Sequence, residues 1–156
     1  MAVVLAWHTP EPDWAGTWKG TLVNHPVRPK ARSVETTMEI GAFPKADNEC
    51  SIWKSTFNVP GKPDVVKDYK LCRANEEDLY FEQGEGVKLT SRWVGELLVT
   101  SYKANTMIFF QTVRLRGDLL EQEIFVAHDV PASKGPAPTV MEGTTVQRIV
   151  LRRVSK

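Results

Sequence analysis

The sequence lacks the features that mark several common protein classes. Its 156 residues include only two cysteines and three histidines, and 20 basic residues nearly balance 19 acidic ones. Two cysteines without a Cys-x-x-Cys pair do not supply the four ligands of a zinc site. A net charge of +1 also lacks the basic footprint of a nucleic-acid-binding protein. We therefore expect no metal site and no nucleic-acid partner.

Long apolar runs are missing as well. The longest run at the N-terminus covers residues 2–7, whereas a membrane-spanning helix needs about 20 apolar residues. The run also lacks the basic start and the longer apolar core of a secretory signal. We predict no membrane span, and we favour a cytoplasmic protein over a mature chain whose signal has been removed.

The two cysteines lie in predicted strands that flank a turn at residues 58–64. If Phe57 lies opposite Val66, Cys50 and Cys72 face each other to within one residue of register. A disulfide between directly opposite strand residues is possible but usually strained, and the cytoplasm keeps thiols reduced. Two free, half-buried thiols are therefore expected.

Helical periodicity is absent over the roughly 11 residues that identify a helix. Instead, proline and glycine separate short runs rich in β-branched and aromatic residues, which is typical of strands. The run at 33–40 alternates cleanly, with Val34, Met38 and Ile40 on one face and glutamates on the other. Ten strands are predicted, at residues 17–24, 33–40, 49–57, 66–73, 78–83, 87–92, 95–102, 106–115, 119–127 and 145–154.

The connections between these strands indicate how they pair. Most are two to six residues long, which favours antiparallel neighbours because parallel crossovers need a dozen or more residues. We predict an all-β protein with a single domain, residues 1–156, folded as an antiparallel up-and-down β-barrel. Residues 1–15 form a lead-in and residues 128–143 a long loop. A two-sheet sandwich is the alternative, although it usually needs connections that jump between sheets.

A short segment, Trp14-Ala15-Gly16-Thr17-Trp18-Lys19-Gly20, resembles the opening of a calycin, the superfamily of lipocalins, fatty-acid-binding proteins and nitrobindin-like barrels. In that superfamily a Gly-x-Trp on the first strand closes one end of the barrel, and a basic side chain from the last strand packs over the Trp. The resemblance implies these roles for Gly16, Trp18 and either Arg152 or Arg153.

Two departures from that pattern limit what the resemblance implies. Nitrobindin-like proteins hold haem through a histidine near the C-terminus, and the last predicted strand has none, so we expect no cofactor. Fatty-acid-binding proteins carry two lid helices after the first strand, and residues 26–32 are too short for them. A more open barrel mouth, or a lid formed by residues 1–15, is expected instead.

Polar residues interrupt the apolar faces of three successive strands. Gln111, Gln122 and Gln147 each lie among apolar residues of the same parity. A buried amide without a partner costs roughly 1–3 kcal/mol. The three amides therefore indicate mutual hydrogen bonding, ordered water or a ligand. The opposite parity, with Ile108 and Phe110 inside, remains open.

Aromatic and long apolar side chains on the same strands predict either the wall of a small-molecule pocket or an ordinary barrel core. With the glutamines, the candidate ligand-binding residues are Met107, Phe109, Trp53 and Trp93.

The favoured hypothesis is a barrel that binds a small apolar or aromatic molecule, as a monomer or homodimer. The alternative is a cofactor-independent isomerase, cyclase or decarboxylase of a secondary metabolite that uses the same cavity. Its proton-transfer candidates are Tyr69, Glu123 and His128, with Lys70 beside them. An ionisable group that points into the cavity would favour the enzyme, and a solidly packed interior would favour an interaction module.

Overall fold

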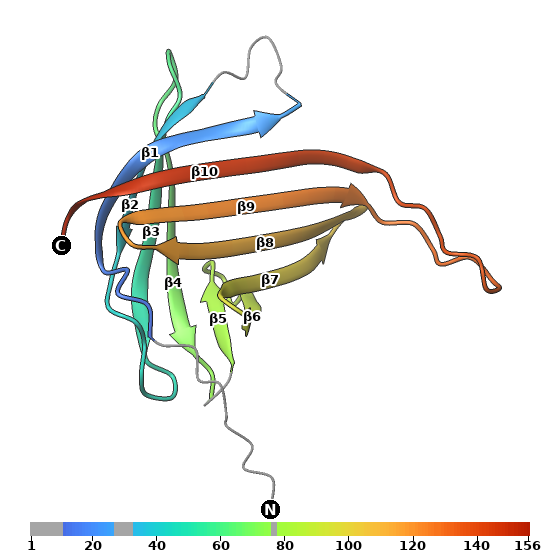
Figure 1. Cartoon of the computed structure of the whole chain (residues 1–156), viewed down its shortest axis with the longest axis horizontal. Helices are drawn as coiled ribbons and strands as arrows, with labels where there is room; N and C mark the ends of the chain where they lie inside the picture. Colours follow the sequence, from blue (N-terminus) through green and yellow to red (C-terminus); the bar gives the residue numbers. More distant parts are fainter. Residues whose placement is uncertain (1–10, 27–32, 76–77) are drawn as a thin grey trace, which may run out of the picture.

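The computed structural model is a closed barrel of ten antiparallel strands (Figure 1). It describes residues 11–26, 33–75 and 78–156. The strands are β1 (Gly16–His25), β2 (Val34–Ile40), β3 (Cys50–Asn58), β4 (Val65–Arg73), β5 (Leu79–Glu82), β6 (Lys88–Val94), β7 (Leu97–Ala104), β8 (Met107–Arg116), β9 (Leu119–His128) and β10 (Gly143–Ser155). In the described ranges, no helix has the length and apolar character needed to cross a membrane.

Each strand pairs with its neighbour in the chain, and β1 pairs with β10 to close the sheet. Thr21, for example, lies opposite Val150 of β10 on one side and Glu35 of β2 on the other. Closure leaves no strand of the sheet as an unpaired edge. The predicted up-and-down β-barrel is therefore confirmed, and the alternative sandwich is wrong.

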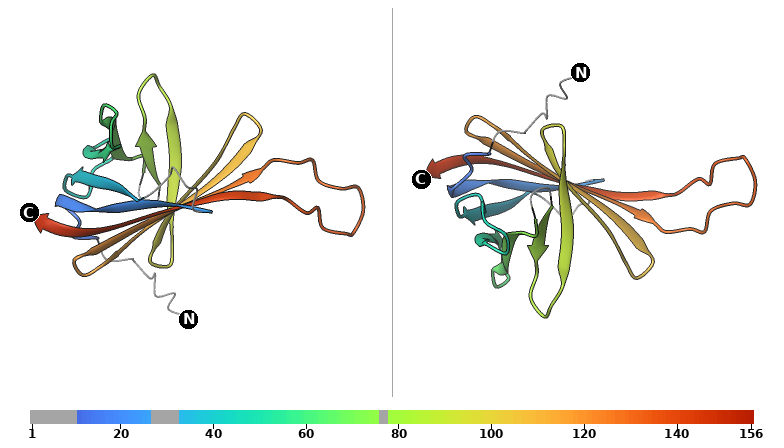
Figure 2. Two further views of the ribbon diagram at one scale, coloured as in Figure 1. Left: turned by 90° about the horizontal axis from the view of Figure 1, so that it is seen from above. Right: turned by 90° about the horizontal axis from the view of Figure 1, so that it is seen from below.

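The observed strands match the ten predicted runs, with differences of a few residues at the ends. The run predicted at 78–83 shortens to β5, and the last strand extends to Ser155. The loop predicted at 128–143 is the connection between β9 and β10, which projects away from the barrel (Figure 2). Residues 1–10 of the lead-in and residues 27–32 between β1 and β2 lie outside the described residues.

The pairing of β3 with β4 differs by one residue from the predicted register. Phe57 lies opposite Val65, so Cys50 lies directly opposite Cys72. The two cysteines form a disulfide, with their Cα atoms 4.0 Å apart. The expectation of two free thiols is therefore wrong. It rested on an assumed reducing compartment, whereas the observed register places both sulfur atoms on the same face of adjacent strands.

One end of the barrel is closed around Trp18, which is fully buried. Its indole Nε1 donates a hydrogen bond to the carbonyl oxygen of Trp14 over 2.8 Å. The guanidinium of Arg153 on β10 lies 4.4 Å from the centroid of the Trp18 ring and donates to two backbone carbonyls of the segment before β1. Arg153, rather than Arg152, is thus the basic partner that the calycin resemblance implied.

Gly20 allows β1 and β10 to approach closely just beyond Trp18. A Cβ atom at Gly20 would collide with the carbonyl oxygen of Val150 and lie 2.9 Å from the Cα atom of Leu151. The absence of a side chain at Gly20 therefore permits the close approach of the two backbones.

Further aromatic rings fill the same end of the barrel. Trp14 contacts Phe43, Trp53 and Trp93, with ring centroids 5.7, 5.0 and 6.0 Å apart. Trp53 in turn meets Phe81 edge-on at 5.2 Å. These contacts stabilise the closed half of the barrel, because aromatic pairs contribute beyond their buried area.

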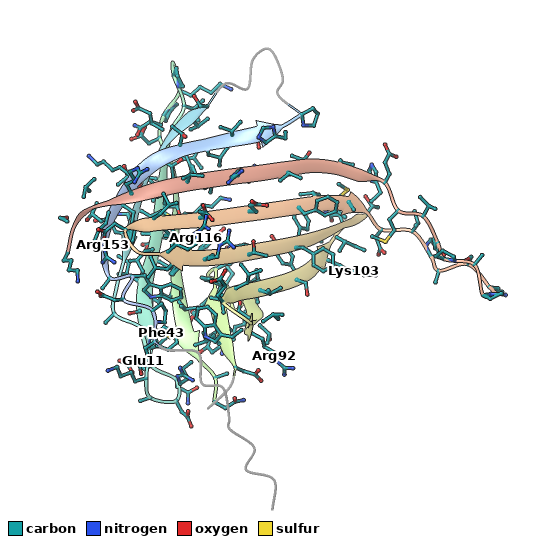
Figure 3. The ribbon with its side chains drawn as sticks, viewed as in Figure 1. Glu11, Phe43, Arg92, Lys103, Arg116 and Arg153 are labelled. Carbon is teal, nitrogen blue, oxygen red and sulfur yellow. A yellow bond between two sulfur atoms is a disulfide. The ribbon has the colours of Figure 1, made fainter. Side chains whose placement is uncertain are left out.

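An ion-pair network lies on β8 and β9 near the closed end, where Arg116 is labelled in Figure 3. Glu121 accepts from Arg114 over 2.9 Å and from Arg116 over 3.0 Å, and its side chain is only 9% exposed. The hydrogen bond from Arg114 is the main reason that the pKa of Glu121 is held below its ordinary value of 4.5. Glu121 is buried because the two arginines cover it, whereas Glu123 on the same face of β9 is exposed.

Glu121→Gln is expected to lower the free energy of unfolding by about 1 kcal/mol near neutral pH. The lowered pKa means that this stabilisation is fully present above pH 4.5 and is lost as the pH falls through the folded-state pKa. Urea unfolding of the original protein and of Glu121→Gln at several pH values measures this. The difference in their free energies of unfolding should become smaller in acid. Glu123→Gln is the matched control, because Glu123 has only a 3.9 Å pair with Arg148. If the loss of free energy of unfolding in Glu121→Gln stays constant down to acid pH, the ion-pair explanation is wrong.

Candidate functional site

The half of the barrel opposite the aromatic cluster contains a cavity of about 240 Å³. Alternation along the strands sends every second side chain inward, and residues from seven strands and one turn meet there. The apolar part of the wall includes Leu22, Val34, Trp53, Phe57, Ile124 and Ile149. The polar part consists of Ser55, Lys67, Tyr69, Gln111, Gln122 and Gln147.

The three predicted glutamines all line this cavity. The Gln122 side chain is buried, and its amide nitrogen lies 3.4 Å from the sulfur of Met38, a weak acceptor. Within the described residues, the glutamine side chains make no hydrogen bond to one another, and those of Gln111 and Gln147 make none at all. Mutual hydrogen bonding therefore does not account for them, and their amide groups face the cavity.

The inner faces of the last strands follow the favoured parity. Val113 is 1% exposed, whereas Phe110, on the opposite face of β8, is 45% exposed. The opposite parity is therefore wrong. It was plausible because both faces of this strand carry large apolar residues, so alternation alone did not separate them.

The predicted apolar and aromatic ligand-binding residues do not all reach the cavity. Trp53 lines it, but Met107, Phe109 and Trp93 do not. Phe109 stacks on Tyr102, with ring centroids 4.8 Å apart, and Trp93 belongs to the aromatic cluster at the closed end.

The predicted proton-transfer residues are not brought together. Tyr69 lines the cavity. Glu123 is exposed because alternation on β9 places Gln122 inside, and Lys70 is exposed on β4 for the same reason. His128 is exposed at the end of β9. An acid–base group made of Tyr69, Glu123 and His128 is therefore absent from these residues.

Tyr69 is protonated at neutral pH, because burial raises the pKa of its phenol above the ordinary value of 10.0. Burial, and the proximity of Tyr69, also raise the pKa of Tyr102. Both phenols therefore serve as hydrogen-bond donors rather than as bases near pH 7.

Sequence reasoning missed Lys67 and Ser55, which face each other across β3 and β4. The Lys67 ammonium lies 5.7 Å from the centroid of the Phe57 ring. The signal was present: Lys67 has the same parity as Tyr69 and Leu71, and continuing that face backwards places Lys67 at the open end. A charged residue normally lies on the solvated face, so alternation alone does not identify Lys67 as part of the cavity wall.

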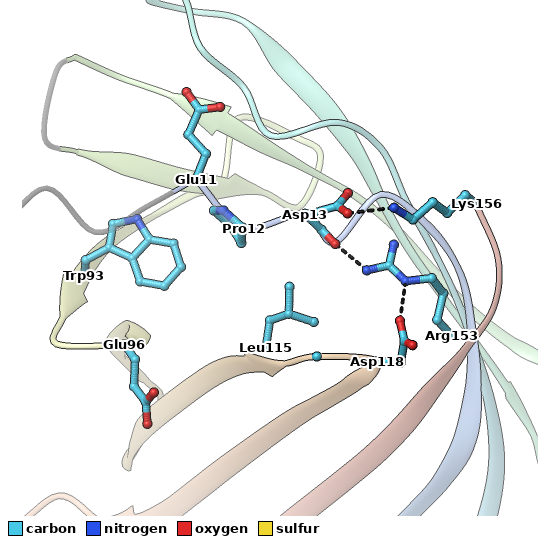
Figure 4. A pocket seen from close by; sticks show the side chains of 10 residues that line it. Glu11, Pro12, Asp13, Trp93, Glu96, Leu115, Asp118, Arg153 and Lys156 are labelled. Carbon is cyan, nitrogen blue, oxygen red and sulfur yellow. Dashed lines mark hydrogen bonds and ion pairs between the residues drawn. The ribbon is translucent and has the colours of Figure 1, made fainter.

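A larger hollow, of about 550 Å³, lies outside the closed end and is shown in Figure 4. Trp93, Leu115 and Pro12 provide its apolar surface. Each of its charged side chains is already in an ion pair; the pairs are Glu11–Lys45, Asp13–Lys156, Glu96–Arg114 and Asp118–Arg153. Its charges are therefore already paired with one another or with neighbouring side chains, and the interior cavity is the better candidate site although it is smaller.

Cys50, Cys72 and Glu82 are the one group in the described ranges that brings three residues of metal-binding type together, within 4.8 Å. Both sulfur atoms are in the disulfide. No thiolate remains there to bind a metal ion.

Comparison of the chain with protein-family models, with curated proteins and with solved structures finds no match to any of them.

Proposed function

We propose that this protein binds a small, largely apolar or aromatic molecule inside the open half of a calycin-like barrel. The observation that carries the proposal is the cavity of about 240 Å³ lined by three glutamines that do not bond to one another. Apolar walls with a few convergent polar groups are the usual composition of small-molecule sites. The polar groups orient the ligand, and burial supplies most of the affinity.

The expected affinity is modest. A planar ligand that buries roughly 300 Å² of apolar surface gains about 7.5 kcal/mol at ~25 cal/mol per Å². Association costs at least about 4 kcal/mol of such gains, and contacts with the polar wall recover part of that. Dissociation constants in the micromolar to millimolar range follow, so titration calorimetry is a suitable measurement.

Gln122→Leu is expected to weaken the binding of 2-naphthol about tenfold, equivalent to ~1.4 kcal/mol. The variant loses an amide that can bond to the hydroxyl, and it adds apolar surface. Naphthalene, which has no hydroxyl, should bind the variant at least as tightly as the original protein. Calorimetric titration of both compounds measures the two effects.

Gln83→Leu is the control for this experiment, because Gln83 lies in the turn between β5 and β6 and outside the cavity lining. The proposal fails if neither compound binds at millimolar concentration. It also fails if Gln83→Leu weakens 2-naphthol as much as Gln122→Leu does.

The second candidate is an enzyme in the same cavity, and Tyr69 is the observation that favours it. A protonated phenol on the wall can donate a proton to a substrate oxygen. The lining contains no carboxylate or imidazole, however, so the base that an isomerase or cyclase needs is not among these residues. We therefore place ligand binding ahead of catalysis. If Tyr69→Phe binds a ligand as tightly as the original protein but no longer converts it to product, catalysis would take precedence over ligand binding.

A further inference from the structure

Lys67 is the one charged side chain among the residues that line the interior cavity. No carboxylate of the described residues forms an ion pair with it, and its ammonium lies 5.7 Å from the centroid of the Phe57 ring. The nearby Asp64 accepts a hydrogen bond from Asn58 over 2.8 Å, and alternation turns Asp68 to the other face of β4. Lys67 is exposed at the mouth of the cavity, and it gives the cavity lining one positive charge without an anionic partner among the described residues.

Ser55 supplies a second donor at the same place. It lies directly opposite Lys67 in the β3–β4 pairing, where side chains of one face approach to about 5 Å between Cβ atoms. Ser55 is 8% exposed, and its hydroxyl makes no side-chain hydrogen bond within the described residues. Tyr69 follows about 7 Å deeper on the same face. A hydroxyl directly opposite a lysine on the neighbouring strand is suited to a negatively charged oxygen, because charge-assisted hydrogen bonds are the stronger ones.

The cavity volume limits the size of the ligand. An apolar cavity of about 150 Å³ holds benzene, so about 240 Å³ holds roughly ten non-hydrogen atoms. A long acyl chain would project from the mouth of the cavity, whereas a single ring with a short acidic side chain fits inside it. The walls contributed by Trp53 and Phe57 provide flat apolar surface for such a ring.

We propose, on the basis of the binding function above, that the ligand is an aromatic monocarboxylate of about ten non-hydrogen atoms. Its ring occupies the apolar part of the cavity near Trp53. Its carboxylate accepts hydrogen bonds from the Lys67 ammonium and the Ser55 hydroxyl at the open end.

The test compares three probes of one shape by titration calorimetry: cinnamate, neutral cinnamamide and cationic cinnamylamine. Cinnamate should bind about tenfold more tightly than cinnamamide, and cinnamylamine more weakly than either. Lys67→Gln should bring cinnamate and cinnamamide to within about twofold of each other while cinnamamide affinity stays unchanged. Lys70→Gln is the matched control, because Lys70 is exposed on the other face of β4, and it should leave the preference intact.

Each outcome separates this inference from the binding function itself. If 2-naphthol binds but cinnamate shows no advantage over cinnamamide, the anion site is wrong and the binding function stands. A cinnamate preference that survives Lys67→Gln also overturns the anion site. If 2-naphthol and all three cinnamyl probes fail to bind at millimolar concentration, both proposals are wrong.

Discussion

Trp18→Ala is expected to lower the free energy of unfolding by about 4 kcal/mol. Trp18 is fully buried, and its removal leaves a large empty volume at the closed end of the barrel. It also removes the ring beneath the Arg153 guanidinium and the partner of the Trp14 carbonyl. These losses add to the lost burial because a buried polar group without a partner is itself costly.

Denaturant unfolding followed by circular dichroism measures this effect. Trp18→Phe should cost less than Trp18→Ala, because it keeps an aromatic ring beneath Arg153 and loses the indole N–H. Val94→Ala, at a side chain that is 62% exposed, is the control and should be nearly neutral. A loss below about 1 kcal/mol in Trp18→Ala would mean that the closed end does not depend on this residue.

Reduction of the Cys50–Cys72 disulfide is expected to lower the free energy of unfolding by about 3 kcal/mol. The two cysteines lie 22 positions apart in the sequence. A closed loop of this size lowers the conformational entropy of the unfolded chain, which raises its free energy by about 3 kcal/mol. Unfolding should therefore occur at lower denaturant concentration with reductant than without it. The measurement requires protein purified without reducing agent.

The double variant Cys50→Ala/Cys72→Ala is the control, because its stability should not respond to reductant. If the original protein is equally insensitive, the two sulfur atoms are not bonded in solution. Mass spectrometry after alkylation gives the same answer independently. A disulfide found in this way would speak against the cytoplasmic location, which remains a prediction, because stable disulfides persist mainly in oxidising compartments.

The inner faces of the strands could be predicted because the side-chain period is two and most connections are short. Alternation therefore predicts that Gln111, Gln122 and Gln147 share one interior, and all three line one cavity. Only the arrangement of the barrel in three dimensions shows which inward residues fill the closed end and which line the open half. Trp93, a predicted ligand-binding residue, lies against Trp14 at the closed end instead.

Other features depend on exact register or on coverage by neighbours, which alternation does not encode. A shift of one residue in the β3–β4 pairing decides whether Cys50 lies directly opposite Cys72 or is offset from it. Glu121 lies on an outer face and is nevertheless buried, because two arginines fold over it. Lys67 shows the converse, since a flexible charged side chain can line a cavity and still reach water at its mouth.

The seam between β1 and β10 has a consequence for how the chain folds. Every other strand pairing joins neighbours in the chain and can form as a hairpin, whereas the seam brings together residues as distant as Trp18 and Arg153. The entropy of closing so long a loop makes this pairing the slow and late step. Until it forms, the two terminal strands are open sheet edges, so the interval before closure is when the chain is most vulnerable to aggregation.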